Sequence, residues 1–297
     1  MTAPVLPEKK FAEFGSYLKR VGFKFEVRPH QVFLARAADL VVSLYASGKV
    51  VIAGKDKTLE REVRWYLEKL GAKGDPLPEK LEALKGRTRI GTDEAGKGDY
   101  FGPLVVAAVL LSPATEGKMK ALGVRDSKKL SDKRVAELGP LVKRTAGTGN
   151  WEVLRIDPPI YNRLYEEMGD QNAILAWGHA RLIENMLAAH EDCRLAVVDE
   201  FSARSLLKAL KQKGQDIEVV QSSGGERDMA VAAASVLARA AFLERLEAMA
   251  GEYGMDFPKG ASAVEDAARG FVRTRGVEYL GQVAKLHFRT TKKVLGP

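Results

Sequence analysis

The chain has 297 residues, of which 45% are hydrophobic and 29% charged, and it contains one cysteine. One cysteine excludes an internal disulfide and a cysteine-rich zinc site, and no apolar run reaches the roughly 18–20 residues of a membrane-spanning helix. The length favours two domains. The first residues lack an apolar signal core, so we expect a cytoplasmic protein with no membrane association.

Positive charge is concentrated in the N-terminal part of the chain. The whole chain carries 47 Lys and Arg against 39 Asp and Glu, a net charge of +8. Residues 1–86 hold 16 of the basic and 11 of the acidic side chains, a net charge of +5. Such a surface attracts phosphate backbones, acidic lipids or acidic proteins, but it can also serve only solubility.

Residues 1–75 are predicted to form a small α+β domain. Apolar spacing predicts a helix over 7–23 and a second one over 58–72, with Thr58 as N-cap and Gly71 at its end. Three strand-like runs lie between the helices, at 23–28, 31–37 and 39–54, the last with a hairpin turn at Ser47-Gly48. The Gly- and Pro-containing stretch that follows predicts a linker over 76–86.

Residues 87–297 show a different pattern, in which strands come first and helices alternate with strands later. Strands are predicted at 88–94, 103–111, 150–156, 194–200 and 216–221. Helices are predicted at 171–190, 205–213, 228–249, 262–276 and 277–286. We therefore expect an α/β domain in which helices flank a mixed sheet.

Two adjacent carboxylates, Asp93 and Glu94, stand between an apolar strand and the flexible backbone Gly96-Lys97-Gly98. Acids beside a buried core are costly unless a positive charge accompanies them, and a metal ion would supply that charge. Neighbouring residues of a regular strand point to opposite faces, so both acids can serve one site only where the strand ends or distorts. The alternative is an ordinary polar strand end before a turn.

Further acids follow later in the chain. Asp199 ends a short apolar strand, and the C-terminal ends of such strands often carry ligand sites in α/β sheets. Asp228 and Glu226 precede the long alanine-rich helix, where an acid can instead be an ordinary N-cap. Scattered carboxylates without a histidine cluster favour Mg²⁺ or Mn²⁺. Carboxylates, such ions and a basic surface together indicate phosphodiester chemistry.

The motif DEAGKGDYFGPLVVAAV at 93–109 resembles the active-site signature of type 2 ribonucleases H, and its GKGDYFGP part resembles that of ribonuclease HIII. Further segments are similar to the same family in the same order. These are RDSKKLSD at 125–132, the segment at 161–187, LAVVDEF at 195–201, MAVAAASVLARAAFL at 229–243 and FPKGAS at 257–262.

This resemblance implies a ribonuclease H-like fold and an endonuclease that hydrolyses the RNA strand of RNA/DNA hybrids, leaving 5′-phosphate and 3′-hydroxyl ends. It implies two-metal-ion catalysis with Mg²⁺ or Mn²⁺. The implied metal-binding and catalytic acids are Asp93, Glu94, Asp199 and one acid before the long helix. We favour Asp228 over Glu226 for that position, because a helix N-terminus fixes its direction. The implied substrate contacts are Gly96, Lys97, Gly98, Ser127, Lys128 and Lys129.

The N-terminal domain is similar to the TATA-binding-protein-like domain that ribonuclease HIII carries and ribonuclease HII generally lacks. We expect it to bind the hybrid, with Lys49, Lys55 and Lys57 as phosphate contacts. We expect a monomer. Two alternatives stay open: cleavage at single ribonucleotides embedded in DNA, as in ribonuclease HII, and a non-catalytic nucleic-acid-binding protein.

Overall fold

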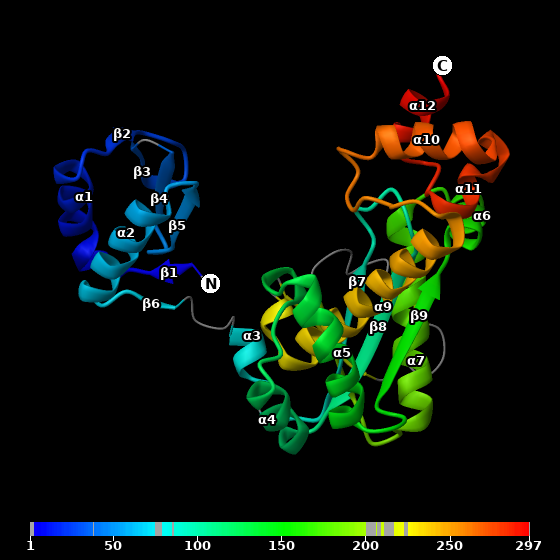
Figure 1. The fold of residues 1–297 in the computed structure, drawn as a ribbon. Coiled ribbons are helices and arrows are strands. Elements are labelled where there is room, and N and C mark those ends of the chain that lie inside the picture. The colour runs from blue at the N-terminus through cyan, green and yellow to red at the C-terminus, as the bar shows by residue number, and fades with distance from the viewer. Residues whose placement is uncertain are drawn as a thin grey trace. The chain divides into compact units, whose positions relative to one another are not determined.

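The computed structural model describes residues 3–37, 39–74, 79–84, 86–199, 206, 209–210, 217–222 and 225–296. The side chains of Lys57, Asp199 and Glu226 lie outside this description. The chain forms two compact units, Met1–Leu77 and Pro78–Pro297 (Figure 1). Among the described residues, no helix has the length and apolar character needed to cross a membrane.

The first unit is an antiparallel sheet with two helices. Its strands, in spatial order, are β2 (Lys24–Glu26), β3 (Gln31–Ala37), β4 (Leu40–Tyr45) and β5 (Val50–Gly54). Helices α1 (Phe11–Arg20) and α2 (Lys57–Lys69) share a core with the sheet that includes Phe14, Leu44 and Val63. The short strands β1 (Pro4–Val5) and β6 (Lys73–Gly74) pair with each other.

The predicted turn and helix end in this unit are confirmed, but the predicted N-cap is wrong. Gly48 adopts a φ of +82° in the turn between β4 and β5, and Gly71 adopts +80° after α2. The N-cap of α2 is Asp56, whose Oδ1 accepts hydrogen bonds from the backbone N–H groups of Thr58 and Leu59. A carboxylate two residues earlier therefore takes the place predicted for Thr58.

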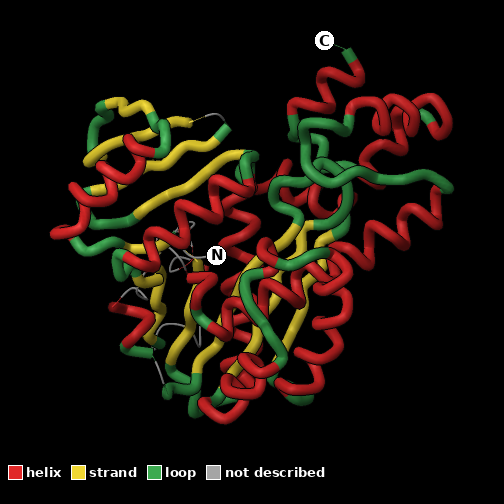
Figure 2. The backbone as a smooth tube through the Cα atoms, turned by 60° about the vertical axis from the view of Figure 1, so that its left-hand side comes forward, coloured by secondary structure: helices red, strands yellow, loops and turns green. Residues whose placement is uncertain are grey.

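The second unit is built on a five-stranded mixed sheet, which Figure 2 shows in yellow. Its spatial order is β11 (Glu218–Ser222), β10 (Leu195–Asp199), β7 (Arg89–Ala95), β8 (Leu104–Leu111) and β9 (Trp151–Ile156). β11, β10 and β7 run parallel, whereas β8 is antiparallel to both β7 and β9. The prediction of a mixed sheet flanked by helices is confirmed.

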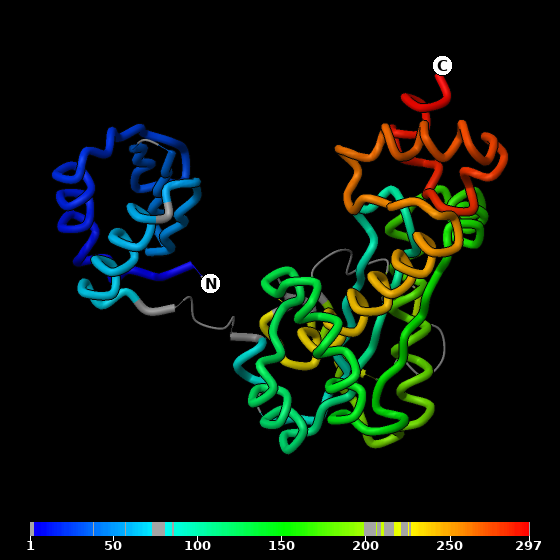
Figure 3. The backbone as a smooth tube through the Cα atoms, in the orientation of Figure 1, coloured from blue at the N-terminus to red at the C-terminus, as the bar shows by residue number. Residues whose placement is uncertain are grey.

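Helices cover both faces of this sheet. On β8, Val105 and Ala107 belong to the core shared with α9 (Met229–Tyr253), whereas Val106 and Ala108 belong to the core shared with α7 (Gln171–Ala189). α9 packs along β7 despite their separation in the chain, as the path in Figure 3 shows. The other helices of the unit are α3 (Glu79–Glu82), α4 (Pro113–Ala121), α5 (Asp132–Ala146), α6 (Pro158–Met168), α10 (Glu265–Arg275), α11 (Leu280–Val283) and α12 (Arg289–Leu295).

Two departures from the predicted elements concern helices, and one predicted helix is mostly untested. Helices α4, α5 and α6 have no counterpart among the predicted elements, and Pro140 inside α5 interrupts the pattern that would indicate one helix. Helix α3 lies within the predicted linker 76–86 and is followed by Leu84, which is buried like Leu81. The helix predicted over 205–213 falls mostly outside the described residues.

Candidate active site

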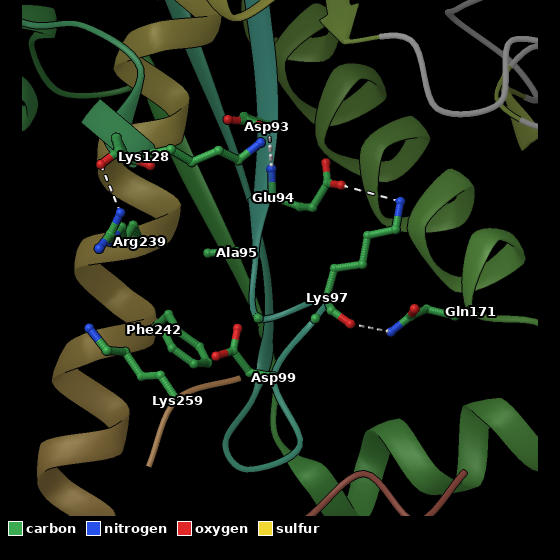
Figure 4. A pocket seen from close by; sticks show the side chains of 13 residues that line it. Asp93, Glu94, Ala95, Lys97, Asp99, Lys128, Gln171, Arg239, Phe242 and Lys259 are labelled. Carbon is green, nitrogen blue, oxygen red and sulfur yellow. Dashed lines mark hydrogen bonds and ion pairs between the residues drawn. The ribbon is translucent and has the colours of Figure 1, made fainter. Parts of the chain in front are cut away.

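A cavity of about 740 Å³ lies at the C-terminal end of β7 (Figure 4). The chain brings five separate segments to it: the end of β7 with its glycine loop, the 127–128 segment, the start of α7, one face of α9 and the segment that contains Lys259. Seven of the predicted site residues line it: Asp93, Glu94, Gly96, Lys97, Gly98, Ser127 and Lys128. Six further lining residues were not predicted: Ala95, Asp99, Gln171, Arg239, Phe242 and Lys259.

Asp93 and Glu94 leave β7 on opposite faces of the sheet, as strand geometry requires. Asp93 is opposite Ala107 in the β7–β8 register and faces α9, whereas Glu94 is opposite Val106 and faces α7. Both still line one cavity, because β7 ends at Ala95 and the chain turns at Gly96 with a φ of +86°. The end of β7 therefore allows two acids on opposite faces of the sheet to line the same cavity.

Asp93 is a buried acid with little compensation for its charge. Burial, and then the neighbouring charge of Glu94, raise the pKa of Asp93 to about 7, although Ser235 and the Glu94 backbone N–H hydrogen-bond its carboxylate. The Lys128 side chain extends toward Asp93 in Figure 4, and its charge opposes this rise in pKa. A nearby cation would stabilise the ionised form of this carboxylate.

Glu94 has a different environment on the other face. Burial alone would raise the pKa of its carboxyl, but the hydrogen bond and charge of His179, together with Lys97 and Lys128, outweigh burial and lower that pKa. Oε2 lies 3.2 Å from Nε2 of His179, and Oε1 lies 3.7 Å from Nζ of Lys97. Glu94 is therefore ionised and oriented at neutral pH.

The backbone places Asp199 beside Asp93. β10 runs parallel to β7 with Val198 opposite Thr92, so the next residues are Asp199, which ends β10, and Asp93, which lies two residues before the end of β7. Ser222 at the end of β11 is opposite Asp199 on the other side. Neighbouring strands lie about 4.8 Å apart, so the backbones at Asp93 and Asp199 are adjacent.

Asp228 does not line the cavity, and its surroundings contradict the prediction that it is a metal ligand. Its Oδ2 accepts a hydrogen bond of 2.7 Å from Nε of the buried Arg89, at the opposite end of β7 from Asp93. Its Oδ1 caps α9 by accepting from the backbone N–H groups of Ala230 and Val231. The contacts of Asp228 in this structure are therefore those of an N-cap and an ion-pair partner of Arg89.

The glycine loop after β7 is fixed on two sides. A Cβ on Gly96 would lie 2.1 Å from the Pro103 carbonyl oxygen, whereas a Cβ on Gly98 would meet no atom within 4 Å. The Lys97 carbonyl oxygen accepts a 3.0 Å hydrogen bond from Nε2 of Gln171 at the start of α7. Gly96 thus shapes the loop, and Gly98 leaves its backbone open to the cavity.

The 127–129 segment is held against α9 by polar contacts. The hydroxyl oxygens of Ser127 and Ser235 lie 2.7 Å apart, and Arg239 donates to the Ser127 carbonyl oxygen at 2.8 Å. Because the Ser127 hydroxyl is buried and bonded, this residue orients the loop. Lys128 reaches the cavity, whereas Nζ of Lys129 lies 3.4 Å from Oδ2 of Asp126 and does not line it.

Helical spacing links the unpredicted residues of α9. Ser235, Arg239 and Phe242 follow one another at intervals of four and three, so they share one face, and that face lies along β7 from Asp93 to Gly96. The carboxylate of Asp132 accepts from Arg239 at 2.6 Å and also from Lys259, which brings the 257–262 segment to the cavity. The spacing of these three residues is present in the sequence, but it indicates a shared site only when Ser235 is known to contact Asp93.

The N-terminal lysines belong to the first unit. Lys49 lies beside the turn before β5 and Lys55 follows β5, and both side chains are exposed. Lys57 begins α2, but its side chain lies outside the described residues.

Comparison with known proteins places this geometry in a family. The model of the family described as "Ribonuclease HII" matches residues 90–291. Ribonuclease HIII of Protochlamydia amoebophila is 36% identical over 281 residues, covering 94% of this chain and 91% of that protein. The chain belongs to the ribonuclease HIII group of this family. Its activity is that of a hydrolytic endonuclease acting on the RNA strand of RNA/DNA hybrids with Mg²⁺ or Mn²⁺.

Solved structures of ribonuclease HIII agree with the fold of both units. Bst-RNase HIII in complex with Mn²⁺ has a TM-score of 0.69 and 32% identity, with 99% of this chain and 97% of that chain covered. Aquifex aeolicus RNase H3 has a TM-score of 0.57 and 27% identity, with 97% and 100% covered. The resemblance to ribonuclease HIII inferred from the motifs is thereby confirmed, which argues against a non-catalytic binding protein.

Proposed function

We propose that Asp93, Glu94, Asp199 and Glu226 bind the divalent ions with which this enzyme hydrolyses the RNA strand, leaving 5′-phosphate and 3′-hydroxyl ends. The observation that supports the proposal is the register of β7 and β10, in which Asp199 on β10 and Asp93 on β7 are the residues that follow the pair Val198 and Thr92. Glu226 stands in the short η3 turn (Gly225–Arg227), on the path from the end of β11 to α9.

The donor set fits such ions. Carboxylate oxygens are the ligands that Mg²⁺ and Mn²⁺ prefer, and a buried Asp93 with a pKa raised to about 7 beside Glu94 lacks positive charge. When bound, the ions supply activation of water and stabilisation of the leaving 3′-oxygen. Among the described side chains no three His, Cys, Asp or Glu form a metal-binding group, and the Asp199 and Glu226 side chains stand outside that set.

The other residues of the cavity bind and orient the substrate. The backbone at Gly96-Lys97-Gly98 can approach the ribose 2′-hydroxyls, because Gly98 presents no side chain to the cavity. Lys128, supported by Arg239 on the same wall, is placed to contact the phosphate next to the acids. A water activated by the bound ions would be the nucleophile, so no side-chain nucleophile is required.

The N-terminal unit contributes non-specific affinity in this proposal. Its exposed Lys49 and Lys55, with Lys57, contact phosphates of the hybrid. Neutralising Lys49 and Lys55 to Gln should raise KM for a hybrid and reduce the dependence of log KM on log salt by about 0.9 per lost contact. The enzyme is proposed to act in the cytoplasm as a monomer. Size-exclusion chromatography with light scattering tests the monomeric state.

The test of the catalytic assignment is cleavage of a long RNA/DNA hybrid with and without Mg²⁺, with the cut positions mapped. D93N should abolish cleavage while hybrid binding, measured by fluorescence anisotropy, is retained. Cleavage by D93N in Mg²⁺ at the wild-type rate would overturn the assignment. A duplex with a single embedded ribonucleotide, run in parallel, distinguishes the ribonuclease HII-like specificity: efficient cutting there would support that alternative.

A further inference from the structure

A buried histidine connects helix α7 to the end of β7. His179 is fully buried on α7. Its Nδ1 lies 2.8 Å from Oγ1 of Thr92, and its Nε2 lies 3.2 Å from Oε2 of Glu94. Thr92 and Glu94 are two residues apart on one strand, so they project from the same face of the sheet. The two ring nitrogens therefore meet two side chains of the same strand.

The directions of these hydrogen bonds follow from the chemistry of the partners. An ionised carboxylate can only accept, so Nε2 of His179 carries the hydrogen and donates it to Glu94. Nδ1 of His179 pairs with the Thr92 hydroxyl, which can donate to a neutral ring and accept from a charged one. Thr92 thereby fixes the orientation of the ring that leaves an N–H group facing Glu94.

The consequence for Glu94 is a restricted side chain. His179 holds Oε2 from the α7 side, while Oε1 is on the side of Lys97, at 3.7 Å from its Nζ (Figure 4). A free glutamate side chain has rotamer freedom that a buried anchor removes before any ligand binds. Asp93 is anchored independently on the other face by Ser235.

We infer that His179, with Thr92 behind it, is a positioning residue that holds one oxygen of Glu94 so that the carboxylate is preorganised for a divalent ion. The inference rests on the proposal that Glu94 is a metal ligand. Partners that hydrogen-bond a metal ligand from behind set its orientation, and their loss typically lowers metal affinity about 10- to 100-fold.

The test measures Mn²⁺ binding by calorimetry on the full chain without substrate, together with the melting temperature and the kinetics of hybrid cleavage. H179L, which removes both hydrogen bonds, should lower Mn²⁺ affinity about 10- to 100-fold and lower kcat, with a smaller effect on KM for the hybrid. H179Q restores a donor near the Nε2 position and should recover most of that affinity. T92V should give a smaller loss than H179L.

A matched control lies on the same helix. Nδ2 of Asn185 donates to Oε1 of Glu152 at 2.8 Å and neither residue lines the cavity. N185L should lower the melting temperature without changing Mn²⁺ affinity. Wild-type Mn²⁺ affinity in both H179L and T92V, whatever their melting temperatures, would overturn the inference and leave His179 a core residue.

The E94Q variant separates this result from the underlying proposal. If E94Q loses Mn²⁺ affinity while the His179 and Thr92 variants keep it, only the positioning role is overturned. If E94Q itself binds Mn²⁺ as the wild type does, the assignment of Glu94 as a ligand fails, and the positioning role falls with it.

Discussion

Nε of Arg89 lies 2.7 Å from Oδ2 of Asp228, and both side chains are almost completely buried. Arg89 also contacts Glu116, whose Oε2 lies 3.0 Å from its Nη1. Asp228 therefore joins the start of α9 to the start of β7 and caps the helix with its other oxygen. This ion pair sets the position from which α9 runs along β7 to the cavity.

Asp228 and Glu226 should respond to substitution in opposite ways. D228A should lower the free energy of unfolding by about 3–5 kcal/mol, because it removes the cap of α9 and leaves the buried arginine with Glu116 as its remaining carboxylate partner. E226Q should leave stability unchanged and reduce Mn²⁺ affinity and cleavage. Urea unfolding, calorimetry and hybrid cleavage measure these effects. A stable Asp228 variant that loses Mn²⁺ binding, beside an active E226Q enzyme, would return the fourth position to Asp228.

Two glycines of the same loop should also differ. G96A should destabilise the protein by about 1–3 kcal/mol, because its φ of +86° is strained for alanine and the new Cβ would meet the Pro103 carbonyl oxygen. G98A should keep the wild-type melting temperature, since no atom lies within 4 Å of its Cβ. Its cleavage rate should still fall by about tenfold, the equivalent of one lost hydrogen bond to the substrate. Full activity in G98A would contradict the proposed backbone contact.

Lys128 and Lys129 form a matched pair of neighbouring cations. K128Q should raise KM for the hybrid and lower the slope of log KM against log salt by about 0.9, as expected for one lost phosphate contact. K129Q should have a smaller effect, because Lys129 pairs with Asp126 outside the cavity. Kinetics between 50 and 200 mM salt, the range over which such contacts weaken, measure both. Equal effects of the two substitutions would show a general charge effect instead.

Lys285 should make stability depend on pH. Its buried ammonium donates to the Gly102 carbonyl oxygen at 2.6 Å, and burial lowers its pKa to about 7, while Asp99 acts weakly in the opposite direction. Below pH 7 the charged form is buried at a cost, and that cost disappears as pH rises toward the ordinary value of 10.5. Its contribution to stability is therefore present above pH 10.5 and is lost as pH falls from 10.5 to about 7.

The comparison with K285M isolates this effect. The free energy of unfolding of the wild type minus that of K285M should rise between pH 6.5 and 9.5 by a few kcal/mol, at about 1.4 kcal/mol per pKa unit. Carboxylates that titrate in the same range cancel in the difference. Urea unfolding at several pH values measures it, and a flat difference would contradict the lowered pKa.

Much of the site could be predicted because it is encoded locally. Asp93, Glu94 and the glycine loop stand within six consecutive residues, and apolar runs on either side define the strands that carry them. The role of Asp228 could not be read in the same way. An acid before a helix suits both a cap and a metal ligand, and only the position of Arg89, 139 residues away, distinguishes them.

The sequence by itself determined the α/β class, the family and the acids at the ends of two strands, since hydrophobic periodicity and contiguous motifs depend on neighbours in the chain. The tertiary structure alone decided what each buried polar group contacts. His179, which a helical apolar pattern presents as an ordinary core residue, acts on Glu94 across 85 positions. Contacts of this kind depend on how helices pack on the sheet, and a buried polar atom must take whatever partner that packing brings within reach.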